Sequence, residues 1–298
     1  MSEWTIGIIG GSGLYQLDSL EDRQWIDVAT PWGTPSDALL IGRLHGIRFV
    51  FLPRHGRGHR IPPSLLNFRA NIDAMKRAGC TDLIAISAIG SLREELAPGR
   101  FVVVDQFIDR TVARESSFFG PGMAAHVSMA DPVCSRLSGL LADAAESAGA
   151  EVSRSGCYVA IEGPQFSTRA ESHLYRSWGC DVIGMTAMPE AKLAREAELP
   201  YALVGMVTDY DCWREGEEAV QVSDILARLN ENAGTARRMV EALATALPKE
   251  RPPSPIDRAL DHALITTPEA RDPAMVARLD AVCRRVLNPP RDAEGDQP

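Results

Sequence analysis

Two aspartates separated by one residue are the most informative chemical groups in this sequence. Asp209 and Asp211 follow an apolar segment, residues 200–207, whose length and β-branched and aromatic content predict a buried strand. In open α/β sheets ligands bind beyond the carboxyl ends of the strands, so both carboxylates are placed to meet a small molecule. A spacing of two on extended chain points both the same way. The alternative is that they cap the next turn, because aspartate is a favoured turn residue.

Groups that suit an anion end other predicted strands. Glycines let backbone N–H groups turn toward an anion, and hydroxyl and guanidinium groups add further donors. These donors are Ser12, Arg54, His55, Ser87 and Thr186, at the ends of predicted strands 4–9, 47–52, 83–87 and 181–186. Together with the two aspartates they predict a site that holds one phosphate beside a group that needs protonation or a nitrogen-rich ring.

The usual nucleotide and metal motifs are missing. Gly11 and Gly13 begin a dinucleotide fingerprint, but Gln16 occupies the position of its third glycine, and no GxxxxGK[ST] segment occurs. The six cysteines are spread along the chain without a CxxC pair, so we expect them to be reduced. We therefore predict no metal and no cofactor.

Strands and helices alternate along most of the chain, which predicts an α/β sandwich with a mixed or mostly parallel sheet. Two further strands, 38–42 and 47–52, form a predicted hairpin, and strand 101–105 precedes a long polar stretch to about residue 130. The predicted helices span 64–78, 131–149, 222–247 and 273–286, with others after Pro189 and after a capping box formed by Thr168 and Glu171.

Composition limits the class of protein. The chain has 298 residues, 45% of them hydrophobic, and a formal net charge of -9, which disfavours nucleic acid as a partner. No charged-then-apolar leader begins the chain, and its apolar runs are shorter than a membrane helix, so we expect a cytoplasmic protein without membrane contact. We predict one catalytic α/β domain over 1–250, and a C-terminal extension over 251–298 with a short helix and a flexible tail.

Six segments together closely resemble the methylthioadenosine phosphorylases of the purine nucleoside phosphorylase family, of trimeric type. They are Gly7–Leu14, Arg54–Gly56, Gly90–Glu95, Asp105–Arg110, Glu162–Ser167 and Thr208–Trp213. The resemblance spans about residues 5–247 in one order and weakens beyond Pro248. It implies a purine nucleoside phosphorylase-like sandwich, with a mixed central β-sheet flanked by helices, and a homo-oligomer, either a trimer or a hexamer.

The same resemblance implies an activity and a role for each matching residue. The reaction is the reversible cleavage of 5'-methylthioadenosine by phosphate to adenine and 5-methylthioribose 1-phosphate, a step of purine and methionine salvage. Phosphate contacts would come from Ser12, Arg54, His55, Ser87, the Ala88 N–H and Thr186. Met185 would pack under the ribose, with Phe166 and Ser167 beside the base, while Asp209 and Asp211 would face N7 and the 6-amino group. Val222, Ile225 and Leu226 would line the methylthio pocket, and His126 would reach that pocket in a neighbouring subunit.

One departure and three alternatives accompany this interpretation. Many relatives carry threonine where this chain has Ser12, but the hydroxyl is retained, so we expect a modest effect. The nearest alternative is a phosphorylase for methylthioinosine or other 6-oxopurine nucleosides. The others are a non-catalytic nucleotide-binding protein and, less favoured because of the missing glycine, a nicotinamide dehydrogenase.

Overall fold

The computed structural model describes residues 3–11, 13–214 and 222–287, and for residues 222–227, 229 and 230 the backbone alone. The strands in these ranges are β1 (Thr5–Gly10), β2 (Glu21–Ile26), β3 (Leu39–Leu44), β4 (Ile47–Pro53), β5 (Asp82–Ser91), β6 (Phe101–Val104), β7 (Gln106–Arg110), β8 (Val152–Ser153), β9 (Cys157–Ile161), β10 (Val182–Gly184) and β11 (Tyr201–Asp209). The helices are α1 (Phe68–Arg77), α2 (Ser135–Ser147), α3 (Arg169–Ser177), α4 (Glu190–Glu196), α5 (Val222–Ala246), α6 (Pro273–Arg278) and α7 (Arg284–Leu287), with 3₁₀ turns η1 (Pro63–Leu65), η2 (Pro255–Arg258) and η3 (Pro268–Ala270).

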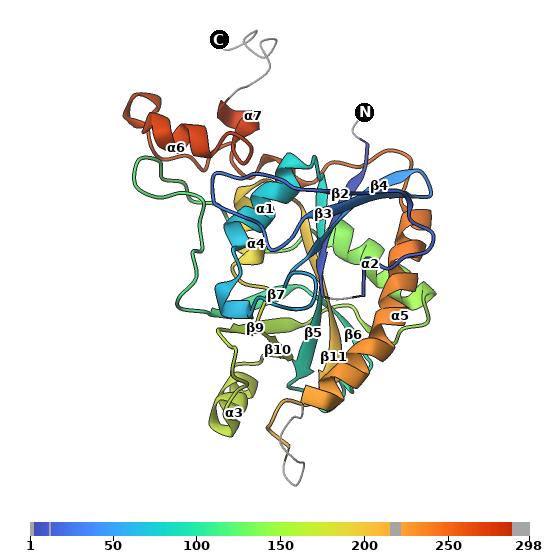
Figure 1. Cartoon of the computed structure of the whole chain (residues 1–298). Helices are drawn as coiled ribbons and strands as arrows, with labels where there is room; N and C mark the ends of the chain where they lie inside the picture. Colours follow the sequence, from blue (N-terminus) through green and yellow to red (C-terminus); the bar gives the residue numbers. More distant parts are fainter. Residues whose placement is uncertain (1–2, 12, 215–221, 288–298) are drawn as a thin grey trace.

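Strand β5 is the branch point of the sheet. It pairs in parallel with β1 on one side and β11 on the other, whereas Gly90 and Ser91 at its end pair with β10 in antiparallel register. The sheet order is β2-β3-β4-β1-β5-β10-β9-β7, with β11 between β5 and β6, and β8 beyond β6 (Figure 1). Parallel and antiparallel pairs therefore occur in one sheet, which confirms the predicted mixed α/β fold.

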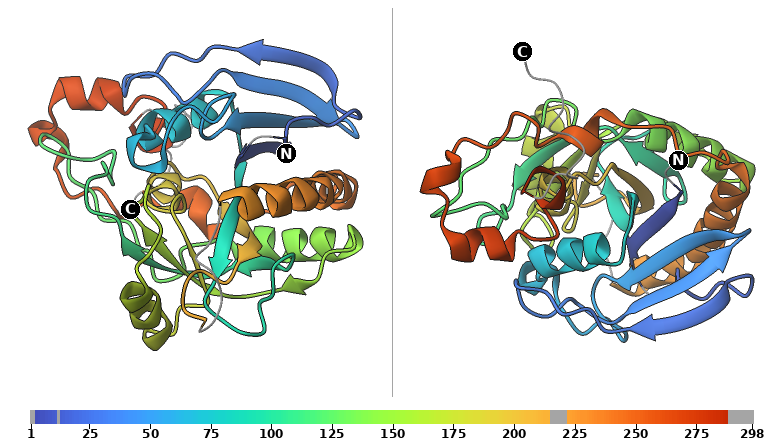
Figure 2. Two further views of the ribbon diagram at one scale, coloured as in Figure 1. Left: turned by 60° about the horizontal axis from the view of Figure 1, so that its bottom comes forward. Right: turned by 90° about the horizontal axis from the view of Figure 1, so that it is seen from above.

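Each face of the sheet carries its own apolar core, because side chains alternate along a strand. Ile84 and Ile86 of β5 belong to the core that α2 and α5 cover. Leu83 and Ala85 belong to the opposite core, which includes residues of α1 and α4. Figure 2 shows α2 and α5 side by side, away from α1 and α4. The chain is thus the predicted sandwich, in which helices flank a central mixed sheet.

Two predicted helices begin later than the sequence suggested. The segment expected at residue 64 first forms the turn η1, and Asn67 then caps α1 by accepting the Ala70 N–H at 3.1 Å. The segment expected at 131 becomes helical only at Ser135, and the Cys134 N–H donates to the Tyr201 carbonyl at 2.7 Å instead. The capping box of Thr168 and Glu171 is confirmed at the start of α3.

Other predictions need correction. Strand β2 was not expected, because its sequence is polar and its side chains are mostly exposed. Strand β10 ends at Gly184, so Met185 and Thr186 lie just beyond it. The single helix expected over 273–286 is two short helices, α6 and α7. The predicted flexible tail, from residue 288 onward, lies outside the described residues.

The segment after residue 250 packs into the main core. Leu260, Met275 and Leu279 belong to the same apolar cluster as the side chains of α1 and α4. Arg251 is paired with Asp82, a fully buried residue of β5 that also binds Arg136. The extension therefore contributes both apolar surface and an ion pair to the structure of the first 250 residues.

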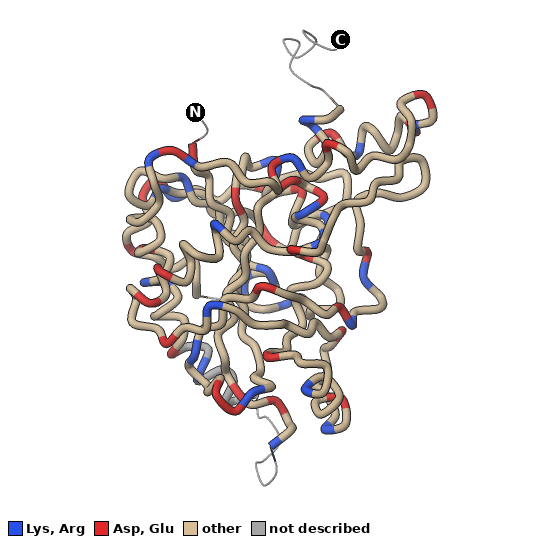
Figure 3. Tube along the Cα trace, turned by 180° about the vertical axis from the view of Figure 1, so that it is seen from behind, with Lys and Arg blue, Asp and Glu red and all other residues tan. Residues whose placement is uncertain are grey.

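Charged residues of both signs occur throughout the described chain. Acidic and basic residues are interspersed along the trace in Figure 3. Within the described ranges, no helix is both long and apolar enough to cross a membrane.

Replacing Arg251 with alanine should lower the free energy of unfolding by roughly 3 kcal/mol, because it removes one of the two guanidinium partners of the buried Asp82 carboxylate. The matched control is Arg154→Ala, whose exposed pairs with Asp143 and Glu146 should contribute little to stability because water screens them. Urea unfolding followed by circular dichroism measures both variants. Equal, small losses in the two variants would show that the extension is not energetically coupled to β5.

Candidate active site

A cavity of about 600 Å³ lies where the carboxyl ends of β1, β4, β5, β10 and β11 meet. Ten of the residues predicted from the sequence line it: Arg54, His55, Ser87, Ala88, Phe166, Ser167, Met185, Thr186, Asp209 and Asp211. The rest of the wall includes Ile161 at the end of β9 and Ala233 of α5. The fold therefore brings these side chains together from segments distant in sequence, while the role of each remains a prediction.

Five predicted residues are not seen at this cavity. Ser12 and the side chains of Val222, Ile225 and Leu226 lie outside the described residues. His126 is exposed on the loop before α2, where its N–H donates to the Ala263 carbonyl at 2.9 Å. It does not line the cavity of its own chain, so its reach into a neighbouring subunit stays a prediction.

The two aspartates sit on an irregular strand end. The register of β11 against β5 shifts between Val207 and Asp209, and Asp211 adopts a φ of 54°. One oxygen of Asp209 accepts the Asp211 N–H at 2.8 Å, and the other accepts the Thr208 hydroxyl at 2.7 Å. A Cβ on Gly90 would lie 3.1 Å from the Asp209 carboxylate, so glycine leaves room for it. The turn interaction expected as the alternative is present, yet both carboxyl groups also line the cavity.

The surroundings of the two carboxyl groups favour protonation. Burial raises the pKa of Asp209, and the hydrogen bonds from Thr208 and from the Asp211 N–H offset only part of that effect. Burial also raises the pKa of Asp211, and the negative charge of Asp209 adds to the increase. A carboxyl group with a raised pKa retains its proton closer to neutral pH. Such a group suits donation of a proton to a bound base.

Two hydroxyl groups face each other on the wall between β5 and β10. The Ser87 and Thr186 oxygens are 3.0 Å apart, and both residues are buried. The Thr186 N–H donates to the Tyr158 hydroxyl at 3.4 Å. That hydroxyl lies 2.1 Å from where a Cβ on Gly184 would be, so the strand needs glycine there. Tyr158 therefore supports a residue of the wall from behind.

Arg54 is fully buried, and its positive charge is already paired with the carboxylate of Glu190. Its Nε and Nη2 donate to the two Glu190 oxygens at 3.0 and 3.1 Å. Nη2 also donates to the Ile9 carbonyl, and Nη1 donates to the Ile86 carbonyl. The Tyr201 hydroxyl donates to the same Glu190 carboxylate at 3.0 Å. Because arginine has five N–H donors, one N–H on Nη1 has no acceptor among the described residues. Arg54 thus presents one directed donor, not an open fork, to an anion in the cavity.

His55 is neutral near pH 7 and differs from the expected donor. Burial and the charge of Arg54 lower its pKa from 6.5 to about 4. Its Nδ1 lies 2.9 Å from the Ile61 carbonyl, so Nδ1 carries the proton and Nε2 is an acceptor. The ring also stacks on His59 at 4.2 Å between centroids. Nε2 of His55 can therefore accept a hydrogen bond from a phosphate oxygen that still carries its proton, but it cannot donate one to an ionised oxygen.

Three supporting residues gave no signal in the sequence. Glu190 follows a proline at the start of a helix, where an acidic residue is expected for the helix dipole alone. Tyr158 and Tyr201 occupy buried strand positions typical of core aromatics. Their polar atoms matter because the fold brings them to the back of the cavity, and strand periodicity does not encode that.

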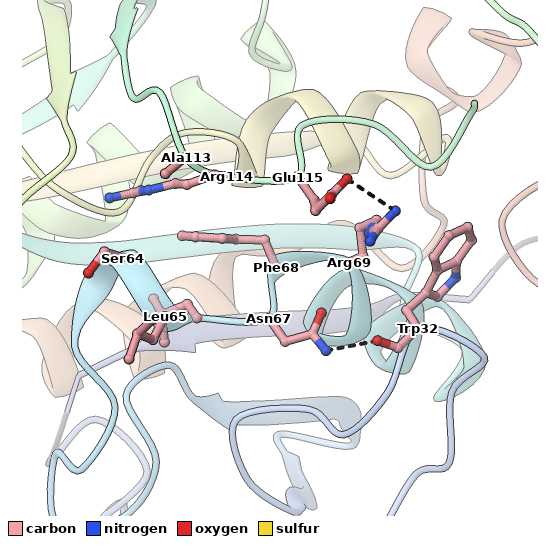
Figure 4. A pocket seen from close by; sticks show the side chains of 10 residues that line it. Trp32, Ser64, Leu65, Asn67, Phe68, Arg69, Ala113, Arg114 and Glu115 are labelled. Atoms are coloured by element: carbon pink, nitrogen blue, oxygen red, sulfur yellow. Dashed lines mark hydrogen bonds and ion pairs between the residues drawn. The ribbon is translucent and has the colours of Figure 1, made fainter. Parts of the chain in front are cut away.

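A second, smaller cavity of about 280 Å³ lies between α1 and the loop after β7. Figure 4 shows its wall, where the Asn67 amide donates to the Trp32 carbonyl at 2.9 Å and Arg69 pairs with Glu115 at 3.5 Å. Its lining includes none of the residues predicted to bind phosphate, sugar or base. Arg114 lies on this wall and reaches behind the main cavity.

Comparison with known proteins identifies similar sequences over nearly the whole chain. The sequence model of the phosphorylase superfamily matches residues 5–245. An S-methyl-5'-thioadenosine phosphorylase of Cereibacter sphaeroides is 60% identical over 284 residues, which cover 95% of this chain and 98% of that protein. One of Bradyrhizobium diazoefficiens is 58% identical and covers 96% and 99%.

Solved structures agree with the sequence matches. A methylthioadenosine phosphorylase from an Antarctic soil metagenomic library superposes with a TM-score of 0.89 at 45% identity, covering 95% of this chain and 99% of that one. A variant of the adenosine/methylthioadenosine phosphorylase of Schistosoma mansoni, in complex with methylthioadenosine, gives 0.77 at 39% identity, covering 82% and 91%.

Changing Arg54 to lysine should weaken the binding of inorganic phosphate. A lysine keeps a positive charge beside Glu190 but loses the directed Nη1 donor, and a charge-assisted hydrogen bond contributes roughly 1.5 to 3 kcal/mol, or about ten- to a hundredfold in Kd. Isothermal titration calorimetry with phosphate measures the change, with the exposed Arg57→Lys as the matched control. An unchanged Kd in Arg54→Lys would rule out a phosphate contact from this side chain.

Proposed function

The chain belongs to the phosphorylase superfamily, and on this premise we propose that it catalyses the phosphorolysis of 5'-methylthioadenosine. The products would be adenine and 5-methylthioribose 1-phosphate, which makes the chain a pentosyltransferase of purine and methionine salvage. The shared name of the bacterial relatives, which align over nearly their full lengths, supports this assignment. A structural relative with methylthioadenosine bound adds to the support.

The observation that carries the proposal is that one cavity contains both carboxyl groups that can donate a proton and a set of hydrogen-bond donors that can bind an anion. Asp209 and Asp211, whose pKa values are raised, line one side. The Ser87 and Thr186 hydroxyls and the Arg54 guanidinium line the same cavity and offer donors to an anion. Such a site can bind a base at an acid and an oxyanion at donors simultaneously.

Phosphorolysis needs both of these functions. As the C1'–N9 bond breaks, its electron pair moves onto the purine and the sugar becomes cationic. A protonated Asp209 would donate its proton to N7, so the base leaves neutral. A phosphate oxygen, held by Ser87, Thr186, Arg54 and the Ala88 N–H, would form the new bond to C1'. The protein supplies proton transfer and positioning, and we propose that it uses no cofactor beyond phosphate.

Selectivity for the base would come from Asp211. When Asp209 carries the proton, the negative charge that helps to raise the pKa of Asp211 is absent, and Asp211 would be the ionised member of the pair. Its carboxylate can then accept a hydrogen bond from the 6-amino group of adenine, whereas a 6-oxopurine would present an acceptor in the same place and repel it. Discrimination at the 5' position would be weaker, since apolar pockets separate similar groups by about 10- to 200-fold. Adenosine is therefore expected as a secondary substrate.

We also propose an assembly and a location. A homotrimer or hexamer would let His126, exposed in the single chain, complete the methylthio pocket of a neighbour. A cytoplasmic location suits an enzyme of small-molecule salvage, and all six cysteines are unpaired. Sedimentation of the purified protein tests the assembly.

The reaction itself is tested by release of free base from methylthioadenosine, methylthioinosine and inosine, each with and without phosphate. The account predicts phosphate-dependent release of adenine from methylthioadenosine. Release of hypoxanthine from inosine alone would keep the fold and reaction class but contradict the reading of Asp211. Tight binding of substrate without any release would instead favour a nucleotide-binding protein.

Changing Asp209 to asparagine should lower kcat on methylthioadenosine by about 10² to 10⁴, as loss of a general acid does. The amide keeps the size of the side chain but has no proton to give. Steady-state rates measure the effect, and Asp143→Asn, at an exposed position of α2, serves as the control. A rate within about threefold of the parent enzyme would exclude Asp209 as the acid.

A further inference from the structure

The ends of β9 and β10 pose a hydrogen-bonding problem. The two strands pair in parallel up to Ala160 and Gly184, and beyond these residues they no longer pair with each other, although β9 continues beside β7 to Ile161. The carbonyl groups of Ile161, Glu162, Met185 and Met188 lie where this pairing has ended. A buried carbonyl without a partner costs about 1 to 3 kcal/mol, so these groups need donors from elsewhere.

Arg114, from the loop after β7, supplies those donors. Nη1 donates to the carbonyls of Met185 at 2.7 Å and Met188 at 2.6 Å. Nη2 donates to the carbonyls of Glu162 at 2.6 Å and Ile161 at 3.4 Å. Nε donates to the Glu162 carboxylate at 2.9 Å, so all five N–H groups of the guanidinium have acceptors.

The position of Arg114 is itself fixed. Its side chain is 2% exposed, and Figure 4 shows it extending past the ring of Phe68, with the guanidinium carbon 5.2 Å from the ring centre. The second oxygen of Glu162 accepts the N–H groups of Val112 at 2.6 Å and Ala113 at 3.0 Å. Guanidinium, carboxylate and loop therefore form one closed unit.

This unit holds one wall of the main cavity from behind. Ile161, Met185 and Thr186 line the cavity, whereas Arg114 does not. Two of the carbonyls bound by Arg114, those of Met185 and Met188, lie on either side of Thr186. The Asp209 carboxylate lies at the end of β11 and accepts the Thr208 hydroxyl and the Asp211 N–H, so none of its hydrogen bonds involves Arg114. The guanidinium thus holds the wall that carries Ile161, Met185 and Thr186, and it contacts neither aspartate.

We propose that Arg114 is a positioning residue that sets Thr186 and Met185 for phosphate and sugar. The proposal rests on the phosphorolysis proposed above. It predicts an asymmetric defect: without the guanidinium, Thr186 and Met185 lose their geometry, whereas Asp209 and Asp211, which Arg114 does not contact, keep theirs. A residue that supported the fold in general would weaken both sides together.

The test compares Arg114→Ala and Arg114→Lys with the parent enzyme. For Arg114→Ala we expect a phosphate KM about tenfold higher and a kcat about ten- to a hundredfold lower, because small displacements near the reacting atoms cost that much. The Kd for free adenine should change by less than about threefold, since the aspartates are untouched. Arg114→Lys should fall between, because an ammonium has three donors for five acceptors. Arg154→Ala is the matched surface control.

Added guanidinium gives a second readout that a general loss of stability would not produce. The ion fits the space that Arg114→Ala leaves, so millimolar guanidinium should restore part of kcat in this variant and none in Arg114→Lys or Arg154→Ala. If Arg114→Ala does not fold, the comparison rests on Arg114→Lys, whose phosphate KM must still rise more than its adenine Kd.

The outcomes separate the proposals. Phosphate and adenine binding that weaken equally in both variants, or a parent-like phosphate KM in folded Arg114→Ala, would overturn the positioning role. A parent enzyme without phosphorolysis would overturn the proposed function instead. Calorimetry with phosphate and with adenine would then still decide whether Arg114 acts on one wall alone.

Discussion

A buried arginine at the edge of the sheet is the constraint on which the rest of this structure depends. A charge removed from water is costly unless it is paired and hydrogen-bonded, and Arg54 is paired with Glu190 and donates to two strand-end carbonyls. The carbonyls come from β1 and β5, Glu190 begins α4, and the Tyr201 that supports it begins β11. One ion pair therefore joins four elements and directs a single remaining donor toward the cavity.

The cavity exists because β5 branches. Its parallel partners β1 and β11 and its antiparallel partner β10 diverge at its carboxyl end, and the strands leave backbone carbonyls without partners as they separate. Arginine side chains satisfy these groups at two places: Arg54 behind the anion donors and Arg114 behind the Thr186 wall. Arg54 and Arg114 thus both satisfy backbone carbonyls at the ends of the strands and lie next to the groups proposed to bind phosphate.

The residues that line the cavity were easier to predict from the sequence than the residues that hold them in place. Asp209, Ser87 and Thr186 were found because polar residues at the ends of apolar strands are conspicuous, and the mixed α/β fold followed from alternating periodicities. Glu190 and Arg114 were not found, since an acid after a helix-starting proline and an arginine in a long loop are typical of exposed positions. Their partners are backbone carbonyls and distant side chains, which tertiary structure alone brings together. The neutral state of His55 also depends on burial next to Arg54, which no local pattern encodes.

The most direct test of the account is a crystal structure of the protein with phosphate and an uncleavable analogue of methylthioadenosine. The account predicts phosphate in contact with the Ser87 and Thr186 hydroxyls and with Nη1 of Arg54, while Glu190 keeps its bonds to Nε and Nη2. It also predicts the purine N7 within hydrogen-bond distance of Asp209. A phosphate bound away from these groups, or a base that turns its N7 from the two aspartates, would contradict the assignment of the two sides of the cavity.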